Sequence, residues 1–217
     1  MNRRSFIKNT ALAATMVGLV PPVMASDLKG GKKKKIIFVF RGVSFADAKN
    51  AFENLNSTKN YAYFLLKYNS QSSGYSHIEG ITNLTEKLKE KYELWYTQDM
   101  DRYMISQVVP NTFSSTSKKT QIIYLHHTEI GHSSNKLYLE RIEEFFTELG
   151  KVYDPSQHKV IVTADIGRNE KLNSCGGRDH SNPTCLETFA LYLGGDPSKL
   201  QPNINLTEQN QILINKF

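Results

Sequence analysis

Residues 160–180 bring carboxylate, guanidinium and imidazole side chains together at spacings that suit metal or anion binding. The segment opens with an apolar, β-branched run, residues 160–163, which predicts a buried strand. Asp165 follows this run directly, at the end of a strand where open α/β sheets keep their ligand sites. Fifteen residues further on, His180 closes a glycine-rich turn that also presents Arg178. The alternative is a surface loop with a capping aspartate and a solvated histidine.

Two earlier strands also end in side chains that could do chemistry. Residues 36–40 form a continuous apolar run, typical of a central parallel strand, and Arg41 follows it. Residues 120–125 predict another strand, and three histidines and Glu129 follow it within seven residues, with His132 the last of them. Such a cluster suits metal binding or acid–base work. Because the carboxyl ends of parallel strands share one edge, these side chains should converge there.

A third candidate is the serine-rich segment before a predicted helix over residues 76–91. Ser73 and His77 stand four residues apart at the start of this helix. A helix N-terminus offers N–H groups and a positive dipole end to an oxyanion or phosphate, so Ser73 could act there as a nucleophile. Ordinary turn and capping chemistry remains the alternative, since serine is common before helices.

The segment Thr-Ala-Asp-Ile-Gly, residues 163–167, resembles the Thr-Ala-Asp-His-Gly motif of the alkaline phosphatase superfamily. The later Gly-Gly-Arg-Asp-His is closer to a twin-arginine-exported branch of that superfamily. The resemblance implies that Asp165 and His180 bind metal, that His132 ends the matching Asp-x-x-Gly-His segment, and that Ser73 and His77 belong to the catalytic site. It also implies a reduced three-layer α/β/α sandwich with a mostly parallel central sheet.

The sequence departs from the family pattern at three ligand positions, which hold Arg41, Thr128 and Ile166. A guanidinium cannot ligate a metal ion. Glu129 could substitute for the ligand lost at Thr128. The resemblance therefore implies at most one divalent ion, zinc or manganese, whose candidate ligands are His132, Asp165, His180 and Glu129.

Three arginines follow predicted strands or lie in the glycine-rich turn, and they suggest a second use of the same edge. Arg41, Arg168 and Arg178 could hold a small anionic ester or another anionic ligand by bidentate hydrogen bonds. Two classes of function therefore remain open: a metal-dependent phosphate or sulfate ester hydrolase with a depleted metal site, and a catalytically degenerate anion-binding or scaffold protein.

The amino terminus predicts export. Arg3 and Arg4 precede a short apolar stretch and a small-residue cleavage site, so residues 1–25 resemble a twin-arginine signal peptide, followed by a basic linker at residues 26–35. A periplasmic or secreted location follows. The apolar stretch is too short to span a bilayer. We expect one α/β domain over residues 36–217.

Charge and cysteine content limit the function classes further. The net charge is +6, but from residue 36 onward 19 basic residues face 20 acidic ones, which argues against a nucleic-acid groove. Cys175 and Cys185 bracket the glycine-rich turn, and after export they could form a disulfide or stay as thiols.

Overall fold

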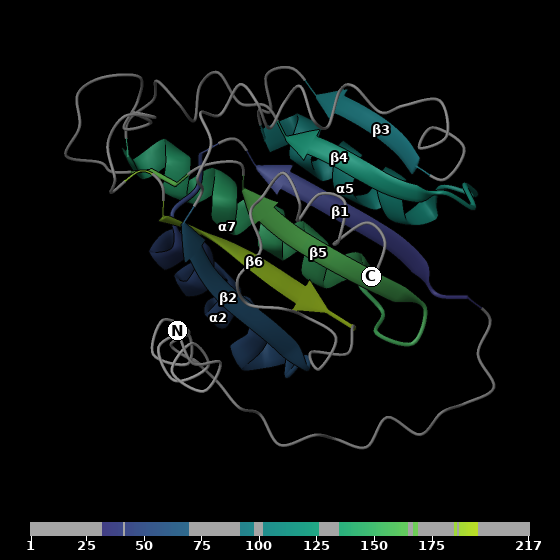
Figure 1. Cartoon of the computed structure of the whole chain (residues 1–217), viewed down its shortest axis with the longest axis horizontal. Helices are drawn as coiled ribbons and strands as arrows, with labels where there is room; N and C mark the ends of the chain where they lie inside the picture. The colour runs from purple at the N-terminus through teal and green to yellow at the C-terminus, as the bar shows by residue number, and fades with distance from the viewer. Residues whose placement is uncertain are drawn as a thin grey trace, which may run out of the picture.

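The computed structural model describes residues 32–40, 42–69, 92–97, 102–125, 135–164, 167–168, 185 and 187–194. Within these ranges the chain forms six strands and three helices (Figure 1). In chain order they are β1 (Lys34–Phe40), α2 (Phe45–Lys59), β2 (Tyr63–Asn69), β3 (Tyr92–Thr97), α5 (Arg102–Ser114), β4 (Thr120–Leu125), α7 (Asn135–Val152), β5 (His158–Ala164) and β6 (Glu187–Leu193). None of the described helices is long and apolar enough to cross a membrane.

All six strands belong to one sheet with the order β2-β6-β5-β1-β4-β3. Strand β1 lies between β4 and β5 and is parallel to both, and β3 is parallel to β4. Strand β6 is antiparallel to its two neighbours, β5 and β2. The predicted α/β class with a mostly parallel sheet is therefore confirmed, and the central strand is the apolar run that the sequence indicated.

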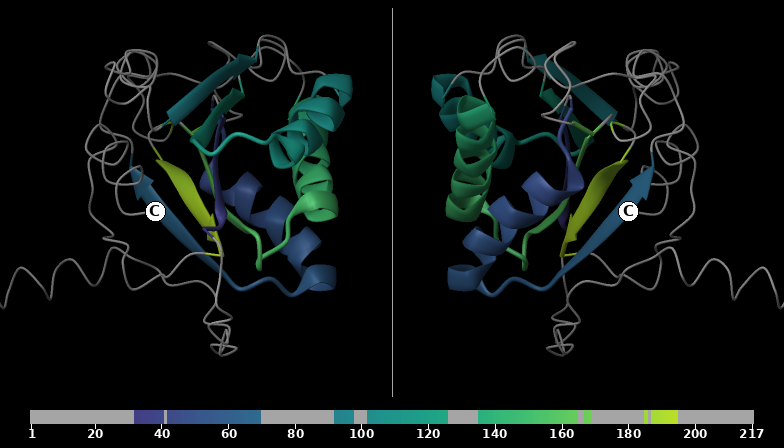
Figure 2. Two further views of the ribbon diagram at one scale, coloured as in Figure 1. Left: turned by 90° about the vertical axis from the view of Figure 1, so that its right-hand side faces the viewer. Right: turned by 90° about the vertical axis from the view of Figure 1, so that its left-hand side faces the viewer.

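The three described helices cover one face of the sheet (Figure 2). Alternate residues of β1 point toward them, and Phe38 packs edge-on against Phe145 of α7 with ring centroids 5.1 Å apart. The other face of β1 carries Ile37 and Val39, which are also buried, in a second apolar cluster with Ile161. The second helical layer of the predicted sandwich, including the helix expected at residues 76–91, lies outside the described residues.

Helix α5 corrects one sequence prediction. In the sequence, Pro110 favours a short helix over residues 102–109 that ends before the proline, but the helix of the structure continues to Ser114 with Pro110 inside it. The ammonium group of Lys34 donates hydrogen bonds to the carbonyl oxygens of Thr112 (2.6 Å), Phe113 (3.2 Å) and Ser115 (2.7 Å). These contacts satisfy carbonyl groups at the helix C-terminus, and they offset the hydrogen bond that a proline removes.

Helix α7 shifts the predicted apolar stripe by one residue at its start. The sequence predicts a helix over residues 134–152 whose apolar stripe begins at Leu137. The structure instead buries Tyr138 fully and leaves Leu137 partly exposed. Tyr138 stands four residues before Ile142, which is the spacing of one helix face. The rest of the stripe, Ile142, Phe145, Phe146 and Leu149, is buried as predicted.

His158, at the start of β5, gives a prediction about pH. Its Nδ1 accepts a hydrogen bond from the Asp154 backbone N–H (3.1 Å), and its ring packs edge-on against Phe113. Burial, helped by the charge of Lys34, lowers the pKa of His158 from 6.5, against the opposing effect of Asp154. The unfolded chain therefore binds the proton more readily. The contribution of His158 to the free energy of unfolding should be fully present above pH 6.5, and it should be lost as the pH falls below that value.

Urea unfolding at pH 7.5 and 5.5 measures this effect. We expect a lower free energy of unfolding at the acidic pH, by at most about 1.4 kcal/mol for each pH unit that one group titrates. His158→Gln is the matched variant, because an amide oxygen can accept the same N–H bond without titrating. An equal loss of stability in the wild type and in this variant would contradict the prediction.

Candidate functional site

The carboxyl ends of three neighbouring strands form one row. Phe40, the last residue of β1, is in register with Leu125, the last residue of β4, and with Ala164, the last residue of β5. The next residues in the chain are Arg41, His126 and Asp165. These three residues lie outside the described ranges. The strand register therefore brings to one edge of the sheet the three strand ends that the predicted site segments follow in the sequence.

Most of the predicted site residues themselves lie outside the described residues. Arg168 is the one that the structure describes. The others are Arg41, Ser73, His77, Glu129, His132, Asp165, Arg178 and His180. In the described part of the chain, no group of three or more His, Cys, Asp or Glu side chains is placed to hold a metal ion. Cys175 is also undescribed, so the disulfide with Cys185 stays a prediction.

Gly167 makes a close backbone contact with Cys185 and Glu187, where β6 begins. Its N–H donates to the carbonyl oxygen of Cys185 (2.7 Å). A Cβ atom at Gly167 would lie 1.9 Å from the backbone oxygen of Glu187, so the two chain segments approach too closely for any other residue. Ala164, held in β5, and Gly167, held against the segment that leads into β6, are the described residues that come before and after Asp165 in the sequence.

Arg168 follows this close contact and is half-buried. Its guanidinium carbon lies 3.8 Å from the centroid of the Tyr138 ring. This distance is within the range of a cation–π contact. The contact joins the segment after β5 to the first turns of α7, at the same edge of the sheet where β1, β4 and β5 end.

Tyr138 belongs to a closed hydrogen-bond network with the start of α2. Its hydroxyl accepts from the Ser44 backbone N–H (3.2 Å) and donates to Asp47 Oδ2 (3.0 Å). The Ser44 hydroxyl donates to the same carboxylate oxygen (2.6 Å) and accepts from the Asp47 N–H (3.1 Å). Serine is a preferred N-cap residue, so the sequence predicts that Ser44 begins the helix after β1, and the structure confirms this.

The environment of Tyr138 keeps its hydroxyl protonated. Burial, followed by the nearby Asp47 carboxylate, raises the pKa of Tyr138 well above its ordinary value. The phenol therefore remains a hydrogen-bond donor to Asp47 at any physiological pH. Because Tyr138 is 0% exposed, it cannot touch a ligand, and its role is to hold other groups in place.

Strand β6 is tied to the same region by two threonine hydroxyls. Thr188 donates to the carbonyl oxygen of Val43 (3.3 Å), in the turn between β1 and α2. Thr163 of β5 donates to the carbonyl oxygen of Phe189 (2.7 Å). Both hydrogen bonds are buried. They fix β6 against β5 and against the turn between β1 and α2.

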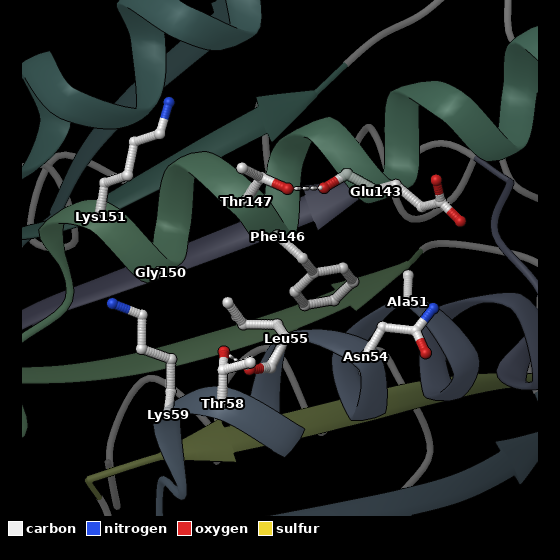
Figure 3. A pocket seen from close by; sticks show the side chains of 10 residues that line it. All are labelled: Ala51, Asn54, Leu55, Thr58, Lys59, Glu143, Phe146, Thr147, Gly150 and Lys151. Carbon is white, nitrogen blue, oxygen red and sulfur yellow. Dashed lines mark hydrogen bonds between the residues drawn. The ribbon is translucent and has the colours of Figure 1, made fainter.

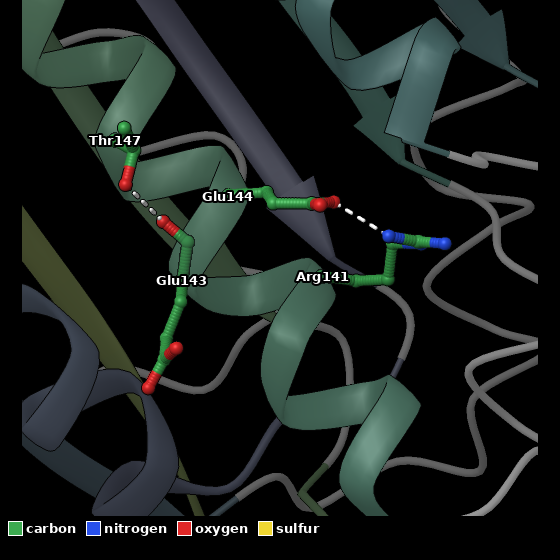
Figure 4. Close-up of polar contacts among 4 residues, drawn as sticks. All are labelled: Arg141, Glu143, Glu144 and Thr147. Carbon is green, nitrogen blue, oxygen red and sulfur yellow. Dashed lines mark hydrogen bonds and ion pairs between the residues drawn. The ribbon is translucent and has the colours of Figure 1, made fainter.

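Arg141, on α7, is a second partly buried arginine, and it is paired within its own helix. Its Nη1 lies 2.7 Å from Glu144 Oε2 on the same helix, and both side chains are largely buried (Figure 4). This i, i+3 pair balances its charge locally. Arg141 is therefore a poor choice for an anion ligand.

A groove of about 430 Å³ lies between α2 and α7. Its floor contains Leu55 and Phe146, and Lys59 and Lys151 lie at the same end of it (Figure 3). Lys151 is paired with Glu148 at 2.6 Å. The lining includes none of the residues predicted for the metal or anion site.

Three solved structures are similar to this chain. One is a protein in the alkaline phosphatase superfamily from Vibrio parahaemolyticus, 12% identical, with a TM-score of 0.47 over 99% of this chain and 75% of that one. The others are the C-terminal periplasmic domain of EcEptC from Escherichia coli and its complex with Zn. Each is 11% identical, with a TM-score of 0.46 over 81% of this chain and 77% of that one. No protein-family model and no curated protein sequence matches the chain.

Proposed function

We propose that the chain is an exported member of the alkaline phosphatase superfamily that hydrolyses phosphate or sulfate esters with one divalent metal ion. The observation that supports this most is the common row of strand ends at Phe40, Leu125 and Ala164. The motif residues of the resemblance follow these ends in the sequence. The α/β class and the site segments therefore agree on one edge of the sheet.

The donor set fits one ion. His132 and His180 supply imidazoles, and Asp165 or Glu129 supplies a carboxylate oxygen, a combination that zinc and manganese accept. A bound ion would polarise the ester oxygen and stabilise the developing charge. Ser73, at the start of the predicted helix, is the proposed nucleophile, with His77 beside it.

The replaced ligands limit the site to that single ion. Arg41 would repel a second cation and would compete for Asp165 as an ion-pair partner. Neither Ile166 nor Thr128 replaces the ligand that the family pattern has at its position. The proposed enzyme therefore relies on arginines for part of the charge neutralisation that a second metal would give.

The second candidate is a periplasmic protein that binds an anion without turnover. The loss of three ligands favours it, as does the contact of Arg168 with the Tyr138 ring, which orders a guanidinium group of the kind that binds anions. The two candidates share the same edge of the sheet and differ in whether Ser73 reacts.

Hydrolysis of chromogenic phosphate and sulfate esters by the purified protein, metal-stripped and then reloaded with zinc or manganese, tests the proposal. We expect turnover only after reloading, and its loss in Ser73→Ala. Ser57→Ala is the matched control, because Ser57 is an exposed serine on α2. Tight phosphate binding without turnover would favour the second candidate instead.

Export is tested separately by replacing Arg3 and Arg4 with lysine. We expect the double variant to remain as precursor in the cytoplasm, because the twin-arginine route requires both guanidinium groups. Fractionation with detection of the full chain measures this. Normal periplasmic accumulation of the double variant would refute the signal-peptide assignment.

A further inference from the structure

Arg168 is held from two sides. Gly167, its neighbour in the chain, donates its N–H to Cys185 and fits only because it lacks a side chain. The guanidinium then lies over the Tyr138 ring at 3.8 Å. The backbone contact fixes where the side chain starts, and the ring contact fixes where it ends.

The ring beneath Arg168 is itself immobilised. Tyr138 is fully buried, and its hydroxyl both accepts from Ser44 and donates to Asp47. Two helices, α2 and α7, therefore hold the phenol by hydrogen bonds and by packing. A ring fixed in this way can serve as a rigid platform for a long and otherwise flexible side chain.

Stacking on the ring is compatible with anion binding. A cation–π contact uses the face of the guanidinium, whereas bidentate hydrogen bonds to a phosphate or sulfate use its edge. An arginine that is already ordered loses less conformational entropy when an anion binds. The platform thus raises anion affinity without touching the anion.

We infer that Tyr138 is a positioning residue that presents Arg168 to the tetrahedral anionic group of the ligand. This inference rests on the proposed function, because it deepens the recognition of a phosphate or sulfate group at the same edge. Asp47 and Ser44 act one step further away, by holding the Tyr138 hydroxyl.

Four variants separate positioning from stability. Tyr138→Phe keeps the ring and loses two hydrogen bonds, so it should lower the melting temperature yet keep the Kd for inorganic phosphate within about twofold. Tyr138→Leu loses the ring and should weaken phosphate binding by about 2- to 30-fold, the range of a cation–π contact. Arg168→Lys should weaken binding with little loss of stability. Arg168→Ala gives the full loss, which Tyr138→Leu should not add to.

A ring-current measurement tests the geometry without any ligand. Protons of the Arg168 side chain should show an upfield NMR shift in the wild type and in Tyr138→Phe, and a normal shift in Tyr138→Leu. Phosphate titration of the same samples by calorimetry gives the Kd values. If Tyr138→Leu does not fold, the other two variants still decide the question. Tyr138→Phe should lower stability and keep phosphate affinity, whereas Arg168→Lys should keep stability and lower phosphate affinity.

The outcomes distinguish this inference from the function beneath it. A missing ring-current shift in the wild type, or a phosphate affinity that follows stability in every variant, overturns the inference and leaves the hydrolase proposal intact. A normal ring-current pattern in a protein that binds neither phosphate nor sulfate overturns both the proposed function and the anion-presenting role. Affinity that follows the ring and the guanidinium supports the positioning role of Tyr138 and is compatible with either candidate function.

Discussion

Gly167→Ala is expected to lower the free energy of unfolding by about 3 kcal/mol, at the upper end of overpacking costs. The added Cβ would lie 1.9 Å from the backbone oxygen of Glu187, and a backbone oxygen cannot move aside as a side chain can. The segment after β5 and the segment before β6 would have to separate. This would also break the hydrogen bond from Gly167 to Cys185. Urea unfolding followed by circular dichroism measures the loss.

Gly150→Ala is the matched control for this prediction. The added methyl group there meets Leu55 Cδ1 at 2.4 Å, which is the far end of a flexible side chain. Gly150 also lies inside a helix, where alanine is more favourable than glycine. We expect a change within about 1 kcal/mol, since leucine can adopt another rotamer. Equal destabilisation by the two substitutions would show that the close contact at Gly167 is not the constraint we describe.

His180→Ala is expected to weaken zinc binding by more than about 100-fold, beyond the 10- to 100-fold that loss of an outer-shell partner costs. His180 is one of two imidazoles in the proposed donor set, and without it the ion keeps too few protein ligands. Competition with a chromogenic zinc chelator measures the change. Arg41→Asp should have the opposite effect and allow a second ion to bind weakly.

His158→Gln is the matched control for the zinc measurement. His158 is at the start of β5, at the opposite end of that strand from Ala164 and Asp165. Its replacement should leave zinc affinity unchanged. If His158→Gln weakened zinc binding as much as His180→Ala did, the ion would not be held at the carboxyl edge of the sheet.

The central strands could be predicted from the sequence because buried strands consist mainly of apolar residues. Strands β1, β4 and β5 each end in a run of five buried, mostly apolar residues, as expected of strands covered on both faces. The sequence also predicted that the carboxyl ends of these strands share one edge, and the register of Phe40, Leu125 and Ala164 confirms this. The N-cap at Ser44 was predictable because its side chain acts on the next turn of its own helix.

Features that depend on distant partners were not predictable. Helix α5 continues past Pro110, and its last carbonyl groups accept hydrogen bonds from Lys34, which is far away in sequence. The platform at Tyr138 was missed because its partners, Asp47 and Arg168, lie on other segments. The spacing from Ile142 was the one local signal that could have indicated Tyr138.

The requirement for glycine at position 167 was equally hidden. The motif around Asp165 indicates metal binding through its carboxylate and imidazole groups. Gly167, in contrast, matters because it has no side chain where β6 begins. A close approach between two backbones is set by tertiary packing, and no pattern within one segment reveals it.

Zinc stoichiometry by equilibrium dialysis, followed by ester hydrolysis on the same sample, tests the central claim most directly. The proposed site predicts one zinc ion per chain, turnover of a phosphate or sulfate ester in its presence, and loss of both in His132→Ala. Two tightly bound ions would contradict the claim that Arg41 and Ile166 eliminate the second metal position. A chain that binds no zinc and turns over no ester would contradict the proposal that the protein is a hydrolase.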